Sequence, residues 1–279
     1  MRRTLQVSVL CLAAGVVSAC SNPEQVIQNP APPTAGVRFI NAVPDTGAMD
    51  LRFVDIVEDN AHYDVPFRNT PSTSGGVTIS TQIEYKPAKA GSRHFKIFMY
   101  GTTAAIASTV VKDTTVNLEA GKLYTALLWG NARGSGPKLT FYEESVPDPQ
   151  GNVALRVLNT TGSPIDVREY ISSASLPSSA TWSNIGGYAL SSYVTASPNQ
   201  FKFNVQPAGG GSALFTDALA LTGAAATVDA EALPGTTVAG SAVTAIIWPK
   251  SVSGSQAASF TTPGVSFVWD RRPPRPPGV

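Results

Sequence analysis

The sequence predicts an all-β protein with two tandem immunoglobulin-like β-sandwich domains, which follow a lipoprotein signal peptide and a proline-rich linker. Three observations lead to this prediction. Only 14% of the residues are charged, and the chain contains 24 glycines and 22 prolines, a composition typical of β proteins with many turns. Short alternating or apolar segments are separated by turn signals. Several of these segments occur twice, in the same order.

The N-terminus has the parts of a bacterial lipoprotein signal. Two arginines precede an apolar run at residues 5–17, which suits a secretory signal and is shorter than the roughly 20 apolar residues of a spanning helix. Two small residues then lead to Cys20. We therefore expect residues 1–19 to be a signal peptide, cleaved between Ala19 and Cys20, with Cys20 lipidated. An ordinary signal peptide with an incidental cysteine, or a buried helix in a cytoplasmic protein, are the alternatives.

Lipidation at Cys20 would make the membrane a partner of the protein. By resemblance to lipoproteins, the thiol takes a diacylglyceryl group and the freed amine a third acyl chain, without any other cofactor. Each buried methylene contributes about 0.8 kcal/mol, so several chains hold permanently. Because Ser21 rather than aspartate follows the cysteine, we expect the outer membrane of a Gram-negative cell envelope. Cys11 leaves with the signal, so the mature chain has no disulfide and no thiolate metal site.

Residues 20–35 form the expected linker after the lipidated cysteine. Prolines at positions 23, 30, 32 and 33 stand among small and polar residues, with no sustained apolar period. Such a segment is extended and semi-rigid, and it separates the body of the protein from the lipid.

Beyond the linker the chain repeats itself. The matching segments are VRFIN (37–41) and LRVLN (155–159), MDLR (49–52) and IDVR (165–168), FKIF (95–98) and FKFN (201–204), and YTALLW (124–129) and VTAIIW (243–248). A period of about 115 residues is the size of a domain. We expect one domain at 36–148, a second at 151–270, and a Pro/Arg-rich tail at 271–279. The two prolines and the glycine within 147–151 mark the boundary.

Within each domain the patterned segments read as strands. Apolar and polar residues alternate at 49–57 and at 93–100. The segments 123–129 and 242–248 are nearly continuous apolar runs, as expected of central strands. The alanine-rich segment 218–232 favours strands joined by a turn over a helix, because Gly and Thr-Val-Asp interrupt it.

Three segments of the first domain resemble the family of unknown function DUF4397. They are VRFINA (37–42), MDL (49–51) and AGKLYT (120–125), and the resemblance covers nearly all of the first domain. The second domain resembles the family at its opening, and has GSAVT at 240–244 in place of the GKLYT pattern. The family occurs in bacterial envelope proteins, so the resemblance implies a β-sandwich envelope protein and no particular reaction.

One pair of charged residues recurs in both copies. Arg38 and Asp50 correspond to Arg156 and Asp166, and each pair could form an ion pair between the first two strands of its domain. Recurrence within one chain indicates shared architecture rather than shared chemistry. A packing role at the sheet edge is therefore the favoured interpretation.

Two tryptophans are candidates for ligand binding. Trp129 and Trp248 occupy equivalent positions at strand ends. Exposed rings there would form a stacking platform for a sugar, whereas rings in the core or at its rim would serve packing, which is the commoner role.

Other function classes find little support in the residues. The chain has 20 basic and 19 acidic residues, and loss of two arginines with the signal leaves no basic footprint for nucleic acid. Glu143 and Glu144 are adjacent, so on a strand they point to opposite faces and cannot form an acid–base pair. His62, near Asp59 and Asp64, lacks the ligand pattern of a calcium loop. No metal site is predicted.

We therefore expect a non-enzymatic, membrane-anchored envelope lipoprotein that presents its sandwiches to an envelope protein or polysaccharide. The alternative is a polysaccharide-binding module that uses exposed aromatic rings. A third reading, an extracytoplasmic hydrolase, requires a carboxylate pair assembled across the domain interface.

Overall fold

The computed structural model describes residues 32–54, 63–69, 83–255 and 258–275. Residues from Pro33 onward belong to one compact unit. The predicted signal, Ala19, Cys20 and His62 lie outside the described residues. The linker was predicted to end at residue 35, but strand β1 already begins at Thr34.

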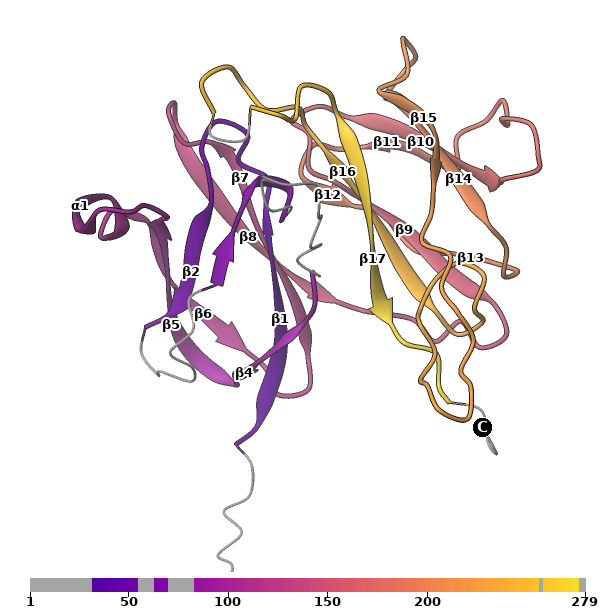
Figure 1. The fold of residues 1–279 in the computed structure, drawn as a ribbon, viewed down its shortest axis with the longest axis horizontal. Coiled ribbons are helices and arrows are strands. Elements are labelled where there is room, and N and C mark those ends of the chain that lie inside the picture. Colours follow the sequence, from indigo (N-terminus) through magenta and orange to yellow (C-terminus); the bar gives the residue numbers. More distant parts are fainter. Residues whose placement is uncertain (1–31, 55–62, 70–82, 256–257, 276–279) are drawn as a thin grey trace, which may run out of the picture. The chain divides into compact units, whose positions relative to one another are not determined.

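Four sheets make up the described part of the chain, and the all-β prediction is confirmed (Figure 1). The first sandwich has an outer sheet with the order β3 (Tyr63–Val65), β2 (Met49–Phe53), β5 (Gly91–Met99) and β6 (Val110–Leu118). Its inner sheet has the order β4 (Lys86–Lys89), β1 (Thr34–Asn41), β7 (Leu123–Asn131) and β8 (Gly136–Glu144). Two short helices, η1 (Phe67–Asn69) and α1 (Ala104–Ala107), lie in its loops.

The second sandwich repeats this strand order. Its inner sheet runs β12 (Ala189–Leu190), β9 (Val153–Asn159), β16 (Ala242–Trp248) and β17 (Gly264–Arg271), with β13 (Val194–Ala196) also paired to β9. Its outer sheet runs β11 (Trp182–Ile185), β10 (Ile165–Ile171), β14 (Phe201–Pro207) and β15 (Phe215–Leu219). In both inner sheets the first strand pairs in parallel with the penultimate strand. The shared topology agrees with the sequence repeat.

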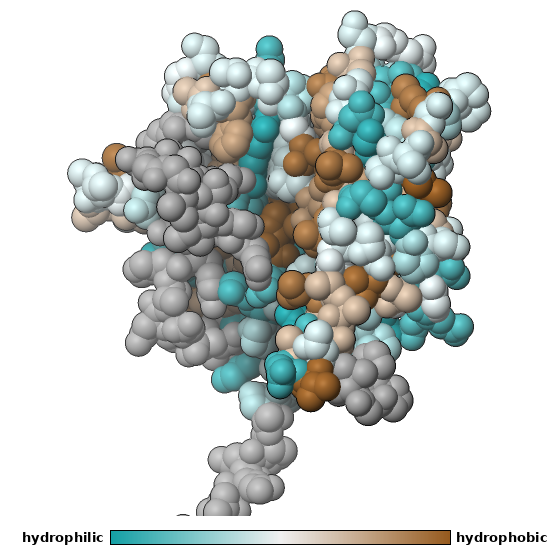
Figure 2. All heavy atoms as spheres, turned by 45° about the vertical axis from the view of Figure 1, so that its right-hand side comes forward, coloured by the Kyte–Doolittle hydropathy of each residue, from teal (hydrophilic) through white to brown (hydrophobic). Residues whose placement is uncertain are grey.

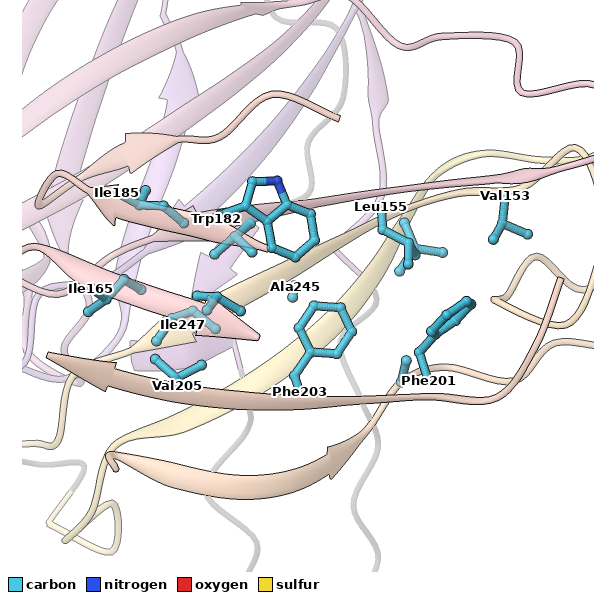
Figure 3. Packing of buried hydrophobic residues seen from close by; sticks show 14 residues of the cluster. Val153, Leu155, Ile165, Trp182, Ile185, Phe201, Phe203, Val205, Ala245 and Ile247 are labelled. Atoms are coloured by element: carbon cyan, nitrogen blue, oxygen red, sulfur yellow. The ribbon is translucent and has the colours of Figure 1, made fainter. Parts of the chain in front are cut away.

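Each sandwich encloses its own apolar core. In the second sandwich, Trp182 stacks on Phe203 at 6.1 Å between ring centroids, and side chains of β9 and β16 meet those of β10 and β14 (Figure 3). In the first, Phe39 of β1 stacks on Phe95 of β5 at 5.4 Å. Burial of these rings supplies most of the driving force that holds each pair of sheets together.

The inner sheets are buried on both faces. All seven residues of β9 and all seven of β16 are buried, as expected of strands with apolar neighbours on each side. Along β1, Val37 and Phe39 point into the first core, while Arg38 and Ile40 point the other way. The second face of each inner sheet therefore packs on the other sandwich.

Several segment boundaries can be compared with the sequence predictions. The predicted strands 93–100, 123–129 and 242–248 correspond to β5, β7 and β16. No helix forms within 218–232; β15 ends at Leu219, and a single antiparallel bridge joins Ala224 to Leu233. The second domain extends one residue beyond the predicted end, because β17 includes Arg271.

Candidate functional site: the contact between the inner sheets

Four charged side chains meet where the two inner sheets face each other. We call Arg38, Glu144, Arg156 and Asp270 the charge cluster. Between sandwiches, Arg38 Nη1 lies 2.7 Å from Asp270 Oδ1, and Arg156 Nη1 lies 2.6 Å from Glu144 Oε2. Within sandwiches, Arg38 Nη2 lies 3.2 Å from Glu144, and Arg156 Nη2 lies 3.5 Å from Asp270. Each arginine is therefore closer to the carboxylate of the other sandwich than to that of its own.

Two equivalent threonines orient the cluster. Thr125 on β7 accepts a hydrogen bond from Arg38 Nε at 2.7 Å, and Thr244 on β16 accepts one from Arg156 Nε at 2.8 Å. The Thr125 hydroxyl donates to Glu144, and the Thr244 hydroxyl donates to Asp270 at 2.5 Å. These contacts fix the planes of both guanidinium groups, which is the geometry that a buried ion pair needs.

Two tyrosines cover the arginines. Arg38 lies 4.7 Å above the ring of Tyr85, and Arg156 lies 4.5 Å above the ring of Tyr193. The Tyr193 hydroxyl donates to Asp270 at 2.9 Å. Burial raises the pKa of Tyr85 and of Tyr193 well above that of a free phenol, so both rings stay neutral.

The cluster keeps its charges. Burial alone would lower the pKa of Arg38, but attraction to Asp270, Tyr85 and Glu144 outweighs it and raises the pKa. The same balance, with Asp270 and Glu144 as the main partners, raises the pKa of Arg156. Two cations and two anions give a net charge of zero, so removal of any one of them would leave an uncompensated buried charge.

An apolar cluster continues the contact beyond the charges. Its buried members come from five strands and the end of β1, and they are Ile40, Ala42, Leu127, Leu158, Ile246, Trp248 and Val268. Beside them, Trp129 of the first sandwich stacks on Tyr188 of the second, with ring centroids 3.9 Å apart and an interplanar angle of 23°. The Tyr142 hydroxyl donates to the Tyr188 carbonyl. The two sandwiches thus share a continuous core.

The candidate sugar platform at the two tryptophans needs correction. Trp248 is 1% exposed, and its Nε1 donates to Ser266 Oγ at 3.0 Å, so its ring cannot meet a ligand. Trp129 is half-buried; its Nε1 donates to Thr140 at 2.9 Å, and Tyr188 occupies a ring face. Both tryptophans serve packing because even-numbered positions of β7 and β16 face the other sandwich.

The predicted pairing of the recurrent arginines with Asp50 and Asp166 is wrong. Asp50 instead accepts a hydrogen bond from Arg52 Nε at 2.8 Å. Asp166 accepts backbone hydrogen bonds from Asn184 at 2.7 Å and Gly209 at 3.2 Å. Both aspartates lie on outer sheets, whereas the arginines point away from those sheets.

The asparagines of the repeated motif have a role that sequence reasoning missed. The Asn159 side-chain amide donates to the carbonyls of Ser163, Ile185 and Gly186 at 2.9, 3.0 and 2.9 Å. Asn41 donates in the same way to the Val65 carbonyl at 2.8 Å. Their recurrence three residues after each arginine was the signal: the asparagines anchor the turns that follow β1 and β9.

A second arginine contact joins the sandwiches at their other end. Arg68 of η1 donates from Nε to the Pro249 carbonyl at 3.1 Å and lies 4.7 Å from the ring of Phe260. It also donates to the Thr262 carbonyl. Burial lowers the pKa of Arg68 to about 10. The side chain therefore acts as a polar strap across the loops that surround β16.

Other titratable residues occupy isolated positions. Glu143 is exposed and pairs with Lys122, while Glu144 points into the charge cluster, as the alternation predicted. His94 contacts Asp113 at 2.6 Å on the surface. Among the described residues, no group of three or more His, Cys, Asp or Glu side chains could hold a metal ion. Within the same residues, no helix has the length and apolar character to span a membrane.

Comparison with known families identifies part of the chain. Residues 35–168 match the model of "Domain of unknown function (DUF4397)". The chain contains a DUF4397 domain. This DUF4397 match runs from β1 through the first sandwich into β9 and β10. It therefore includes three members of the charge cluster, and Asp270 lies outside it.

Solved structures give weak similarity. One is titled "Alpha-glucan binding by a streptococcal virulence factor"; it has 18% identity and a TM-score of 0.23, with 66% of this chain and 88% of that chain covered. Another, "The Bacillus anthracis TIE protein", has 9% identity and a TM-score of 0.21, with 77% of this chain and 33% of that chain covered. A search of curated proteins finds no match.

Proposed function

We propose that this DUF4397 protein is a lipid-anchored component of the bacterial cell envelope that acts by binding a partner, without catalysis. The observation that carries this proposal is the joint core of the two sandwiches. Cross-sandwich ion pairs of 2.7 and 2.6 Å and a stacked Trp129–Tyr188 pair make a single rigid body from two repeats. Rigidity of this kind lowers the entropic cost of presenting a surface to a partner.

The distribution of buried charge supports a role without catalysis. The buried carboxylates Glu144 and Asp270 are each engaged by two arginines and a threonine. A hydrolytic pair assembled across the sandwich interface would need carboxylates free to face a substrate. These two instead face each other's arginines in a core without an opening for one.

Residue pattern supports the anchor and the location. Small residues followed by Cys20, behind a basic start and a short apolar run, favour lipidation and export. With Ser21 after the cysteine, we place the protein on the outer membrane of a Gram-negative envelope. An envelope protein is the expected partner. A sugar platform on Trp129 and Trp248 is not proposed, because packing occupies both rings.

Metabolic labelling with radioactive palmitate tests the anchor. The wild-type protein should carry label, and Cys20→Ser should abolish it. Cys11→Ser is the matched control, because that cysteine is expected to leave with the signal and its substitution should not change labelling. Label that persists in Cys20→Ser would refute the anchor. Crosslinking in intact cells, followed by purification, then identifies the bound partner, and recovery of the protein alone would count against a binding role.

A further inference from the structure

The two sandwiches point in the same direction. Arg38 near the start of β1 and Arg156 near the start of β9 meet in the charge cluster, whereas Trp129 and Tyr188, at the opposite ends of the inner sheets, stack on each other. We call the end at which β1 and β9 begin the proximal end. The described chain enters there at Thr34, and both N-terminal and C-terminal segments lie toward the bottom of Figure 1.

A long hairpin of the second sandwich lies at this proximal end. In the first sandwich, β6 and β7 are joined by a tight turn whose Gly121 N–H donates to the Thr34 carbonyl at 2.8 Å. In the second, residues 220–241 join β15 to β16, and we call residues 221–235 the proximal hairpin. Its position is fixed by the Gly240 N–H, which donates to the Asn152 carbonyl at 2.8 Å.

The proximal hairpin is a formed element. Ala224 and Leu233 exchange two backbone hydrogen bonds of 2.9 Å. At its base, Gly223 has a φ of +84°, and a Cβ there would lie 2.6 Å from the Leu233 carbonyl oxygen, so the two arms cross backbone to backbone. At its tip, Arg275 donates to the Val228 carbonyl at 2.8 Å and pairs with Glu231 at 3.0 Å.

This hairpin presents large apolar side chains to the outside. Val228 at the tip is 74% exposed, Leu233 is 61% exposed and Leu221 is 37% exposed. Figure 2 shows hydrophobic residues at the surface of the lower end of the molecule. Exposed apolar residues gathered on one projecting element mark an interaction surface rather than ordinary scatter.

The position of the chain start selects the occupant. Cys20 is 13 residues before Pro33 (33 − 20), a chain that spans at most about 45 Å when fully extended. A tether of this length gives its attached body a local concentration at the bilayer on the order of millimolar. A hairpin with only weak affinity for lipid would therefore be bound most of the time.

We infer that the proximal hairpin rests on the bilayer that carries the lipid anchor, with Val228 and Leu233 inserted at the headgroup level. This inference depends on the proposed anchor at Cys20. Asp229 and Glu231 accompany the arginines at this end, so apolar contact rather than attraction to anionic lipid drives the insertion. The distal end, with the Trp129–Tyr188 stack and α1, then faces the periplasmic side and the partner.

Depth measurement on the full-length protein tests the inference. Val228→Cys is labelled with an environment-sensitive fluorophore and reconstituted into neutral phosphatidylcholine vesicles that contain doxyl-labelled lipid. Val252→Cys is the matched control, because Val252 is a 38% exposed valine whose N–H donates to the Pro44 carbonyl beyond β1, at the distal end. We expect the lipid quencher to reduce the fluorescence at position 228 and leave position 252 unchanged. Leu233→Asp should relieve the quenching at 228.

The outcomes separate the inference from the proposed function. If the protein floats with vesicles but position 228 is quenched no more than position 252, the anchor stands and the inference is overturned, whether solvent or a second copy of the chain covers the hairpin. If the parent protein reacts with the fluorophore at Cys20 and does not float, the anchor fails, and the inference fails with it. Selective quenching that is insensitive to salt supports both.

Discussion

Glu144→Gln removes one charge from the centre of the molecule and tests the central role of the charge cluster. The Glu144 side chain is fully buried and lies 3.2 Å from Arg38 Nη2 and 2.6 Å from Arg156 Nη1. The substitution preserves shape but changes the net charge of the cluster from zero to +1. Breaking a buried ion pair by removing one partner costs about 3–5 kcal/mol. That is a large part of the roughly 5–15 kcal/mol that stabilises a typical domain.

Urea denaturation of the mature chain, followed by circular dichroism, measures this loss. Glu143→Gln is the matched control, because Glu143 is the preceding residue on β8, is exposed and pairs only at the surface with Lys122. Its midpoint should stay close to that of the wild type. If Glu144→Gln is no more destabilising than Glu143→Gln, the charge cluster does not hold the sandwiches together, and the reasoning is refuted.

A double variant separates lost attraction from stranded charge. Glu144→Leu combined with Arg156→Met removes one cation and one anion and leaves Arg38 paired with Asp270 at 2.7 Å. Replacing a buried ion pair with apolar residues is often neutral or stabilising. The double variant should therefore be more stable than Glu144→Gln.

Two further predictions concern hydrogen bonding and pH. Burial raises the pKa of Tyr85, so in alkali the unfolded phenol ionises near its ordinary pKa while the folded one stays protonated; stability therefore falls as pH rises above about 10. The Tyr85 hydroxyl has no hydrogen-bond partner among the described residues, so Tyr85→Phe should unfold like the wild type at pH 7 and resist urea better at pH 11. An unchanged midpoint at pH 11 would exclude Tyr85 as a source of alkaline sensitivity. Asn159→Ala strands three carbonyls, two of them at 2.9 Å, and should cost about 1–3 kcal/mol in the same assay, whereas exposed Asn152→Ala should cost little; equal losses would contradict the anchoring role of Asn159.

Local pattern was sufficient to predict the strands and the repeat. Alternation and apolar runs identified β5, β7 and β16, because side-chain direction along a strand depends only on neighbouring positions. The same alternation correctly separated Glu143 from Glu144. Shared topology of the two sandwiches agrees with the order of the repeated segments.

Contacts between the sandwiches could not be predicted in this way. Arg38 and Asp270 are 232 positions apart, and nothing in their local sequence connects them. The recurrent Asp50 was a nearer candidate, but it lies on the outer sheet, behind the core. A usable signal did exist: an arginine on a strand with apolar residues on both faces must find a buried carboxylate. Trp248 was ambiguous because a strand-end aromatic can face solvent or a second sheet.

The exchange of partners inside the charge cluster has a consequence for dividing the molecule. Each half supplies one cation and one anion whose shortest contacts belong to the opposite half. Expressed alone, either half would expose an apolar sheet studded with misplaced charges and would tend to aggregate. A backbone cut in the strand-free connection at residues 145–152 should leave the fragments associated, and separately produced fragments should reassemble. The ancestral single repeat would then have been a symmetric homodimer, whose two chains later became one.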